Sequence, residues 1–346
     1  MNSAREGFRP LTLLIFLAAS LITFAICVAA GSVRIPPADI ITIIWRSVRR
    51  MPAPADSAAY SILLSVRLPR VICVALTGAA LSISGAAMQG LLRNPLADGS
   101  TLGVSSGASL GAVTAIAFGI TIPGAPFAGT AVCAMASAFV SLTLILSLAY
   151  RLDFSLSTNT IILIGVIYSM FVSSIITFIT ILAADKVRQI AFWTMGSLSG
   201  STYANARVLA VTLFVCGGVI MTRARELNAF AIGEDNARHI GVNVGRVKLI
   251  ILITVSALIG VCVSIGGTIG FVGLVTPHMI RMITGPNHNR LLPACAFGGA
   301  VFLMLADLAA RTVLNPLELP IGVVTSFTGA ILFVYIFFKS RRNGHA

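Results

Sequence analysis

The side chains that could carry chemistry are few and scattered. The chain has 4 histidines and 11 acidic residues, and none of them forms the spacing of a nucleophile, base and orienting group that indicates an enzyme. The cysteines occur singly inside apolar runs, without metal or redox spacing: Cys27, Cys73, Cys133, Cys216, Cys262 and Cys295. Lys339 is the only lysine before a serine, and no glycines lead into it, so a phosphate loop is missing. We expect no catalytic residue, metal, cofactor or nucleotide in this chain.

Asp307 lies inside an apolar run, and Arg311 follows one helical turn later. Within a membrane, an acid in such a position is a candidate for an ion or proton relay, and Asp307 would then be the coupling group of an ion-driven secondary transporter. We favour the alternative, a structural ion pair between Asp307 and Arg311. His278 and Arg281 lie in another apolar run, beside Pro277.

The composition makes the lipid bilayer the solvent of this chain. Apolar residues make up 57% of it, charged residues only 10%, and the mean hydropathy is +0.97. The apolar runs are about twenty residues long and do not alternate with polar residues, which predicts helices and not a barrel. The net charge of +13 is scattered over short loops, so we expect no nucleic-acid partner. The predicted fold class is an all-α polytopic membrane protein.

The apolar runs predict about ten transmembrane helices in a single domain covering 1–346. They lie near 11–30, 69–91, 101–120, 125–149, 159–183, 206–222, 248–268, 271–284, 294–312 and 321–338. The first run resembles a signal peptide but is longer than a typical h-region, so we expect it to be retained. An even number of spans places both termini on one side, and the basic residues near both ends favour the cytoplasm.

One feature of the sequence predicts transport, and a second calls for a functional explanation. Residues 75–95 match 257–277 at an offset of about 182, with roughly eight identical positions, and the two helices should run in opposite directions, as in an inverted repeat. The segment between the first two spans also carries much positive charge although parity places it outside: Arg34, Arg46, Arg49, Arg50, Arg67 and Arg70.

The stretch from Arg67 to Ser109, RLPRVICVALTGAALSISGAAMQGLLRNPLADGSTLGVSSGAS, resembles the permease subunits of type II ABC importers for iron-siderophores, haem and cobalamin. Further blocks follow in that family's order: Phe192 to Gly200, Leu227 to Val244, Gly266 to Pro293 and Glu318 to Ser326. The resemblance implies a permease in a prokaryotic cell membrane. It would work with two ABC ATPase subunits, a substrate-binding protein, and a second permease copy or paralogue.

The resemblance also implies roles for particular residues. Residues 227–244 match the coupling helices that dock on the ATPase, a role that falls here to Gly233, Glu234, Ala237, Arg238 and Gly241. Arg67, Arg70 and Arg311 match arginines that receive acidic side chains of the substrate-binding protein, which a planar guanidinium grips well; the alternative is interfacial anchoring. Thr158 and Asn159 match the cytoplasmic gate, although a simple polar turn fits equally.

The resemblance leaves the substrate open. It favours a ferric siderophore, followed by cobalamin and haem, and it does not decide between a homodimer and a heterodimer. One position departs from the family pattern, because the run after Gly329 lacks the usual proline. That absence puts the geometry of the last helix in doubt.

Overall fold

The computed structural model describes residues 10–33, 35–49, 51, 58–122, 126–154 and 157–343, and within these ranges it contains helices and no β-strand. In chain order they are α1 (Pro10–Ala29), α2 (Pro37–Val48), α3 (Ala58–Ser61), η2 (Ile62–Arg67), α4 (Leu68–Leu91), η3 (Gly99–Leu102), α5 (Val104–Ala117), α6 (Pro126–Leu152), α7 (Thr158–Leu182), η4 (Ala184–Lys186), α8 (Val187–Thr194), α9 (Tyr203–Thr212), η5 (Leu213–Gly217), α10 (Gly218–Thr222), α11 (Ala224–Ala231), α12 (Glu234–His239), α13 (Val244–Gly266), α14 (Val272–Thr284), α15 (His288–Thr312) and α16 (Ile321–Asn343).

The all-helical class is confirmed. Seven helical stretches of the described chain are long and apolar enough to cross a membrane, and shorter apolar helices cover Val104–Ala117 and Ile321–Ile336. Helix α14, the remaining short crossing expected from the sequence, spans only 13 residues and contains Pro277. Arg34 and Arg50, which contributed to the outward charge, lie outside the described residues.

The second span begins earlier than the sequence indicates. We expected it to start at Pro69, but a continuous helix runs over Ala58–Leu91. Proline has no N–H to donate to the carbonyl four residues earlier, and its ring crowds that carbonyl. The six-residue π-helix Ile62–Arg67 ends two residues before Pro69. The wider turn of a π-helix gives the chain room to continue as a helix through that proline.

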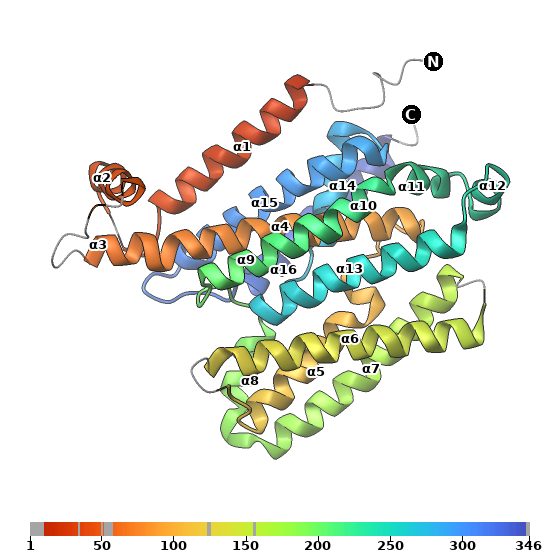
Figure 1. Cartoon of the computed structure of the whole chain (residues 1–346), viewed down its shortest axis with the longest axis horizontal. Helices are drawn as coiled ribbons and strands as arrows, with labels where there is room; N and C mark the ends of the chain where they lie inside the picture. Colours follow the sequence, from red (N-terminus) through yellow and green to blue (C-terminus); the bar gives the residue numbers. More distant parts are fainter. Residues whose placement is uncertain are drawn as a thin grey trace.

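Helix α4 lies at the centre of the bundle, packed against α13, α14 and α15 (Figure 1). The packing is close because glycines face each other across the helices. A Cβ on Gly78 would overlap the Gly299 carbonyl, and one on Gly85 would overlap the Gly273 carbonyl. Small residues that allow such approach are the usual means of helix association in lipid, where the hydrophobic effect gives little drive.

Helices α4 and α13 run in opposite directions along the long axis of the molecule (Figure 1), as the internal repeat predicts. Their matched sequences nevertheless diverge in structure. Gly85 continues the α4 helix, whereas Gly267 has φ +68° and ends α13. The segment after α8 packs against this break, where the Ser197 N–H donates to the Gly266 carbonyl at 2.8 Å.

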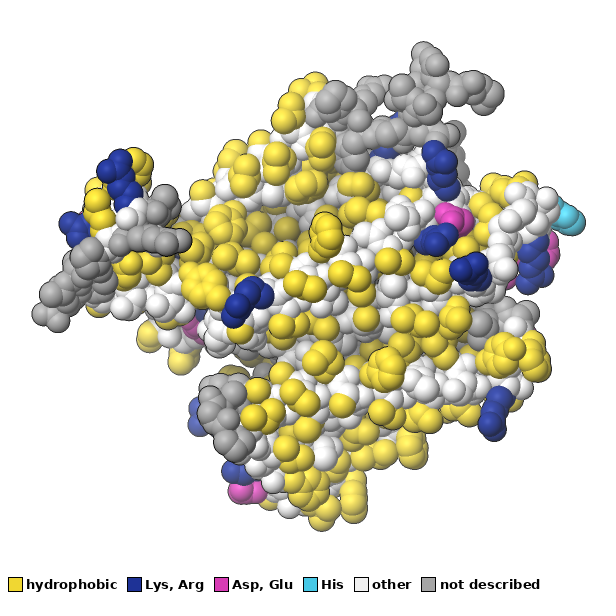
Figure 2. Space-filling view, in the orientation of Figure 1, with side chains coloured by type: hydrophobic (Ala, Val, Ile, Leu, Met, Phe, Trp, Pro, Cys, Tyr) yellow, Lys and Arg dark blue, Asp and Glu magenta, His cyan; other side chains and the backbone are white. Residues whose placement is uncertain are grey.

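Helix α16 is unbroken over Ile321–Asn343, which answers the doubt raised by the missing proline. Gly329 still has a packing role, because a Cβ there would lie 2.5 Å from the Cβ of Phe271. The outer surface of the bundle is largely apolar (Figure 2), as expected for a protein whose solvent is lipid.

The close approach of α4 and α14 predicts that Gly85→Ala destabilises the protein. Alanine normally stabilises a helix relative to glycine by roughly 0.5–1 kcal/mol, but here its methyl group meets backbone, and overpacking costs about 1–3 kcal/mol. Thermal unfolding of the purified chain in detergent measures the effect. Gly218→Ala is the matched control, because a Cβ on that helical glycine meets no atom within 4 Å. Equal melting temperatures for the two variants would contradict the packing argument.

Candidate functional site

A cluster of mostly buried charges joins α4, α15 and the loop before α16 at the end of the molecule that carries α2 and α3. Arg70 donates through Nε to Asp307 Oδ1 at 2.9 Å and through Nη1 to Glu318 Oε2 at 2.9 Å. The other Asp307 oxygen lies 3.2 Å from Arg311 Nε. The side chains of Asp307, Arg311 and Arg70 are 2%, 3% and 7% exposed. The Asp307–Arg311 ion pair predicted from the sequence is present, and Arg70 joins it.

The same cluster satisfies the carbonyl groups at the end of α1. The last four carbonyls of a helix have no partner within it. The Ile26 carbonyl accepts from the Ala30 N–H, and Arg311 Nη2 donates to the Cys27 carbonyl at 2.5 Å. Arg67 donates to the remaining two, those of Val28 and Ala29, at 3.3 and 2.9 Å, and also to the Val33 carbonyl. Positive charge here also complements the negative end of the helix dipole.

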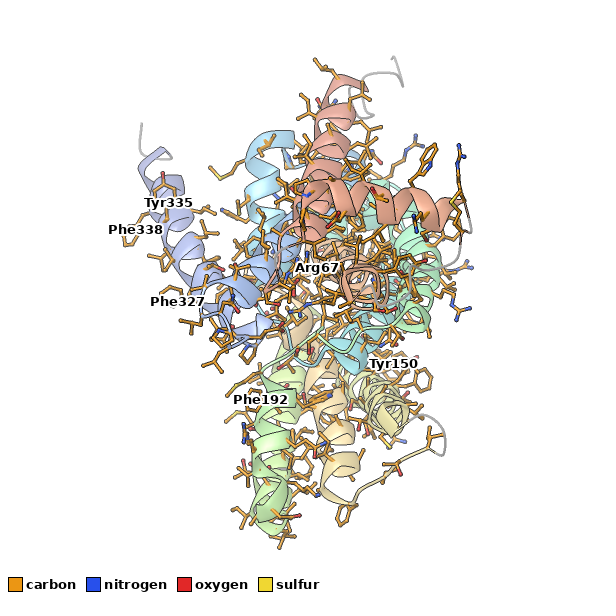
Figure 3. All side chains as sticks on the ribbon, turned by 90° about the vertical axis from the view of Figure 1, so that its left-hand side faces the viewer. Arg67, Tyr150, Phe192, Phe327, Tyr335 and Phe338 are labelled. Carbon is orange, nitrogen blue, oxygen red and sulfur yellow. The ribbon has the colours of Figure 1, made fainter. Side chains whose placement is uncertain are left out.

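These contacts bear on the docking role predicted for Arg67, Arg70 and Arg311. The structure brings the three arginines together, and Figure 3, which looks on this end, shows Arg67 among the helix ends. Their guanidinium groups, however, are buried against this chain's own carboxylates and carbonyls. Glu318, whose side chain is 39% exposed, is the most accessible member of the cluster. The docking role therefore stays a prediction, and a partner's acid would have to displace an internal contact.

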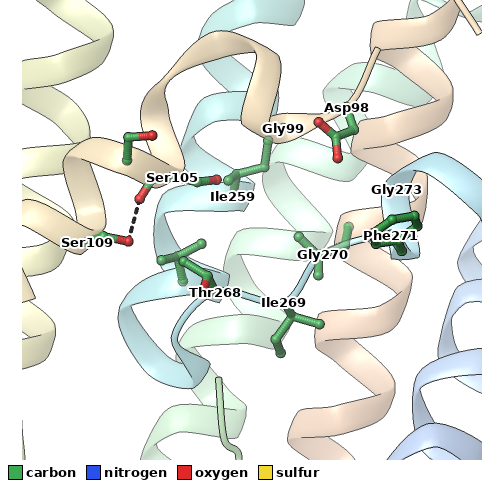
Figure 4. Close-up of a pocket in the computed structure, with 13 residues that line it drawn as sticks. Asp98, Gly99, Ser105, Ser109, Ile259, Thr268, Ile269, Gly270, Phe271 and Gly273 are labelled. Atoms are coloured by element: carbon green, nitrogen blue, oxygen red, sulfur yellow. Dashed lines mark hydrogen bonds between the residues drawn. The ribbon is translucent and has the colours of Figure 1, made fainter. Parts of the chain in front are cut away.

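A cavity of about 230 Å³ lies between α4, α5, α13 and the link from α13 to α14 (Figure 4). Its walls combine apolar side chains with hydroxyl groups and one carboxylate: Leu81, Asp98, Gly99, Ser105, Ser106, Ser109, Ile259, Val263, Thr268, Ile269, Gly270, Phe271 and Gly273. Pockets for drug-sized ligands are typically about 300–1,000 Å³. This cavity is therefore too small to enclose a bulky solute.

The link that lines this cavity has an unusual backbone. Gly267 and Phe271 have φ values of +68° and +67°, and for a bulky residue such as phenylalanine that conformation is rare. Thr268 Oγ1 donates to the Thr194 carbonyl, which fixes the link against the end of α8. Backbone that leaves the helix at membrane depth is tolerated where protein buries it or where it lines a cavity. The link meets both conditions.

The connector, residues 223–243, lies at the opposite end of the molecule (Figure 1). Gly233 and Gly241, with φ of +116° and +89°, allow the turns on either side of α12. Leu227 and Phe230 of α11 are buried, whereas Ile232 and Ile240 are 59% and 64% exposed. The connector therefore has an anchored inner face and an outer tip with unpartnered apolar side chains.

Lys248 ties the connector to the membrane helix α13. Its ammonium group is buried and lies 2.8 Å from the carboxylate of Glu234, the first residue of α12. Glu234, predicted to contact an ATPase, thus points toward this chain. Ala237 is buried as well, and of the predicted coupling side chains Arg238 is the exposed one, 3.4 Å from Asp235.

The contacts that Lys248 and Asn228 make were not predicted from the sequence. The side-chain oxygen of Asn228 accepts from the His288 backbone N–H at 2.8 Å, which joins α11 to the start of α15. A lysine in the first turns of an apolar helix is the signal that could have identified Lys248, because such a charge requires a partner. Asn228 gave no comparable signal, since asparagine is ordinary in a polar connector.

The predicted gate residues begin α7, at the same end as the connector (Figure 1). Thr158 and Asn159 form the first turn of that helix, which Ser157 caps by accepting from the Thr160 N–H at 3.4 Å. The Asp153 carboxylate in turn accepts from the Ser157 N–H at 3.1 Å. This geometry is that of an ordinary capped helix start, and the gate stays a prediction.

Comparison with known proteins gives a consistent set of relatives. Residues 17–339 match the FecCD transport family. The chain is 42% identical to YvrB, an uncharacterized ABC transporter permease of Bacillus subtilis, over 96% of this chain and 93% of that protein. It is 35% identical to the cobalamin import permease BtuC of Halobacterium salinarum, over 91% and 82% of the two chains. It is 36% identical to the hemin transport permease HmuU of Yersinia pestis, over 83% and 86%.

A solved structure has the same fold along nearly the whole chain. It is described as an inward-facing conformation of a transporter assigned to the metal-chelate type of ABC transporters. The TM-score is 0.83 at 29% identity, with 96% of this chain and 100% of that chain covered.

The buried charges predict that Asp307→Asn lowers stability severely. Asparagine leaves Arg70 and Arg311 without their shared carboxylate, and removing one member of a buried ion pair costs about 3–5 kcal/mol. Thermal unfolding in detergent measures the loss. Asp185→Asn is the control, because that side chain is 77% exposed and its ion pair with Lys186 is long, at 3.6 Å. A normal melting temperature for Asp307→Asn would show that the cluster does not hold α4 to α15.

Proposed function

Because the chain belongs to the FecCD transport family, we propose that it forms the membrane pathway of an ATP-driven importer for a metal chelate, with ATP hydrolysis on separate subunits. The observation that carries this proposal is the connector. It presents an exposed apolar tip at one end of the molecule and is joined by the Lys248–Glu234 ion pair to α13, which lines the cavity.

The connector is the proposed docking surface for two ABC ATPase subunits, one on each of two permease copies. Ile232 and Ile240 would enter a groove of the partner, since exposed apolar side chains on a rigid tip suit a buried contact. Arg238 lies beside them. This assignment places the connector, both termini and the gate residues Thr158 and Asn159 on the cytoplasmic side, in the cell membrane of a prokaryote.

The ion pair between Lys248 and Glu234 gives the coupling a physical route. A displacement of α12 is transmitted to the first turns of α13, because separating a buried lysine from its carboxylate is costly. Further along α13, Ile259 and Val263 line the cavity, and the link that follows adds Thr268. Movement of the connector can therefore change the shape of the cavity without chemistry in this chain.

The other end of the molecule is the proposed docking surface for a substrate-binding protein. An acidic side chain of that protein would compete with Glu318 for Arg70, whose Nη1 is bound to Glu318 at 2.9 Å. Glu318 can yield this position at low cost, because its carboxylate is partly in solvent. Arg67 and Arg311 are held by α1 carbonyls and would contribute mainly positive potential.

The proposed substrate is a bulky metal chelate that passes between two permease copies, because the cavity beside the link between α13 and α14 encloses only about 230 Å³. The names of the relatives favour cobalamin or haem. A ferric siderophore remains the prediction from sequence resemblance. The polar groups of the cavity are hydroxyls and one carboxylate, which are compatible with any of these solutes.

An ion-coupled secondary transporter is the competing function, with Asp307 as its coupling group. Such a group must bind and release an ion during the cycle. Asp307 contacts two guanidinium groups, and its side chain is 2% exposed. These contacts favour a structural role for this acid.

The coupling route predicts that Glu234→Gln separates ATP hydrolysis from import. The variant removes the charge that holds Lys248, so the complex should still hydrolyse ATP but import less substrate per ATP. A change in coupling of roughly 0.5–2 kcal/mol is expected for a residue on such a route. Import and hydrolysis are measured together in proteoliposomes that contain the complete complex. Asp235→Asn is the matched control, because Asp235 lies next in α12 and its side chain is 87% exposed. Equal ratios of import to hydrolysis in both variants would refute the route.

The substrate class is tested by uptake in cells that lack or express this chain together with its partner subunits. Labelled cobalamin, haem and a ferric siderophore are supplied separately at low concentration. We expect one chelate to accumulate only when the chain is present, with a tetrapyrrole chelate favoured by the relatives' names. If the complex is assembled in the membrane and the uptake of all three chelates is unchanged, the proposed substrate class is wrong.

A further inference from the structure

We propose that helix α2 is an interfacial helix that rests on the membrane surface and binds anionic lipid headgroups. The contact with lipid follows from the shape and charge of α2 and does not depend on the substrate. Helix α2 lies at the end of the molecule opposite the connector, so in the orientation given under Proposed function the lipid that it contacts is that of the outer leaflet.

The exposed side chains of α2 form an apolar face. Ile40 and Ile43 are buried against the protein. Ile41, Ile44 and Trp45, at the i, i+3 and i+4 spacing of one helical face, are 70%, 44% and 56% exposed. An apolar face of this kind is unstable in water, so it requires a covering phase or partner.

The direction of α2 matches the membrane plane. Helix α4 runs along the long axis of the molecule and α1 is tilted from it, whereas α2 is seen nearly end-on in Figure 1 and side-on in Figure 3. It therefore lies across the axis that the spanning helices follow. It also lies just beyond the end of α1, whose 20 residues form one of the candidate membrane spans. This is the depth of the headgroup layer.

The basic residues of α2 lie beside its apolar face. Arg46 and Arg49 are one turn apart, and the Arg49 guanidinium lies 4.3 Å from the centre of the Trp45 ring. Figure 2 shows basic side chains next to apolar ones over this helix. Tryptophan at the boundary and arginine toward the water are typical of helices in the membrane interface.

Lipid fits this surface better than a protein from the aqueous side. The apolar face adjoins the buried seam of Ile40 and Ile43, and the basic residues follow on the far side of Trp45. Around the circumference of α2, the face buried against the protein is followed by the exposed apolar face and then by the basic residues. This order is typical of a helix at the edge of a bilayer. A soluble protein would meet Arg46 and Arg49 first and leave the isoleucines uncovered. The arginines suit the phosphates of anionic lipids, which a guanidinium grips bidentately.

The chain offers a direct optical test, because Trp45 and Trp193 are its only tryptophans. The Trp193→Phe variant leaves Trp45 as the sole reporter. The full chain is reconstituted in nanodiscs whose lipids carry bromine, a fluorescence quencher, either near the headgroup or near the acyl terminus. Because the apolar face of an interfacial helix is buried roughly 5–10 Å, we expect strong quenching by the shallow bromines, weaker quenching by the deep ones, and little by aqueous iodide.

Lipid selectivity is tested with the same reporter. At equal content, brominated phosphatidylglycerol should quench Trp45 more than brominated phosphatidylcholine, since each basic residue near an anionic surface gives a preference of about fivefold. Arg46→Gln with Arg49→Gln should remove this preference. Arg188→Gln is the matched control, because that arginine also lies over an aromatic ring, Phe192, but in α8. The control should keep the preference, and a preference that survives in the Arg46→Gln and Arg49→Gln variant would contradict the proposal.

Quenching of Trp45 by iodide, without quenching by either brominated lipid, would overturn the proposal by placing α2 in water. If a substrate-binding protein then shields Trp45 from iodide, the face is a protein docking surface instead. Failure of the import proposal would leave this test unaffected, because its readout is the depth of Trp45 and not uptake.

Discussion

The last four backbone carbonyls of a helix have no hydrogen-bond partner within it, and the rest of this structure depends on how the chain meets that demand at α1. Arg67 and Arg311 supply the donors. The positive charges of these two arginines would repel each other. The Asp307 carboxylate contacts Arg311 and Arg70 and so compensates part of the positive charge. Because these residues come from η2, α4 and α15, satisfying the carbonyls of α1 also fixes the position of that helix against the central pair. The loop before α16 joins through Glu318.

The same requirement shapes the other end of the molecule. Lys248 is buried in the first turns of α13, and its charge is compensated by Glu234 on the connector. Between the two ends, α4 and its neighbours approach through glycines, so they can move as one packed body. The cavity lies beside this packing, at the link between α13 and α14, and Gly273 belongs to both. In the proposed coupling, a force applied at the connector would reach the cavity through α13.

Much of this organisation could be predicted from the sequence, and what could not has identifiable causes. The spans follow from hydrophobicity, and the Asp307–Arg311 pair follows from spacing on a helix. The extension of the second span beyond Pro69 could not be predicted, since a π-helix has no sequence signature in a single chain. The hydrogen bonds from Arg67 to the carbonyls of α1 also could not be predicted, because every residue has a backbone carbonyl and the sequence does not mark which ones need a donor. Gly85 and Gly267 occupy matched positions, but Ala86 and Ala87 follow the first and Thr268 and Ile269 the second, and only Gly267 has a positive φ.

The most direct measurement concerns the source of energy. The chain is reconstituted in proteoliposomes with its ATPase subunits and a substrate-binding protein, and accumulation of a labelled chelate is followed. We expect accumulation that requires hydrolysable ATP on the side of the connector and does not respond to a proton or sodium gradient. Accumulation driven by such a gradient in liposomes that contain this chain alone, without ATP, would contradict it.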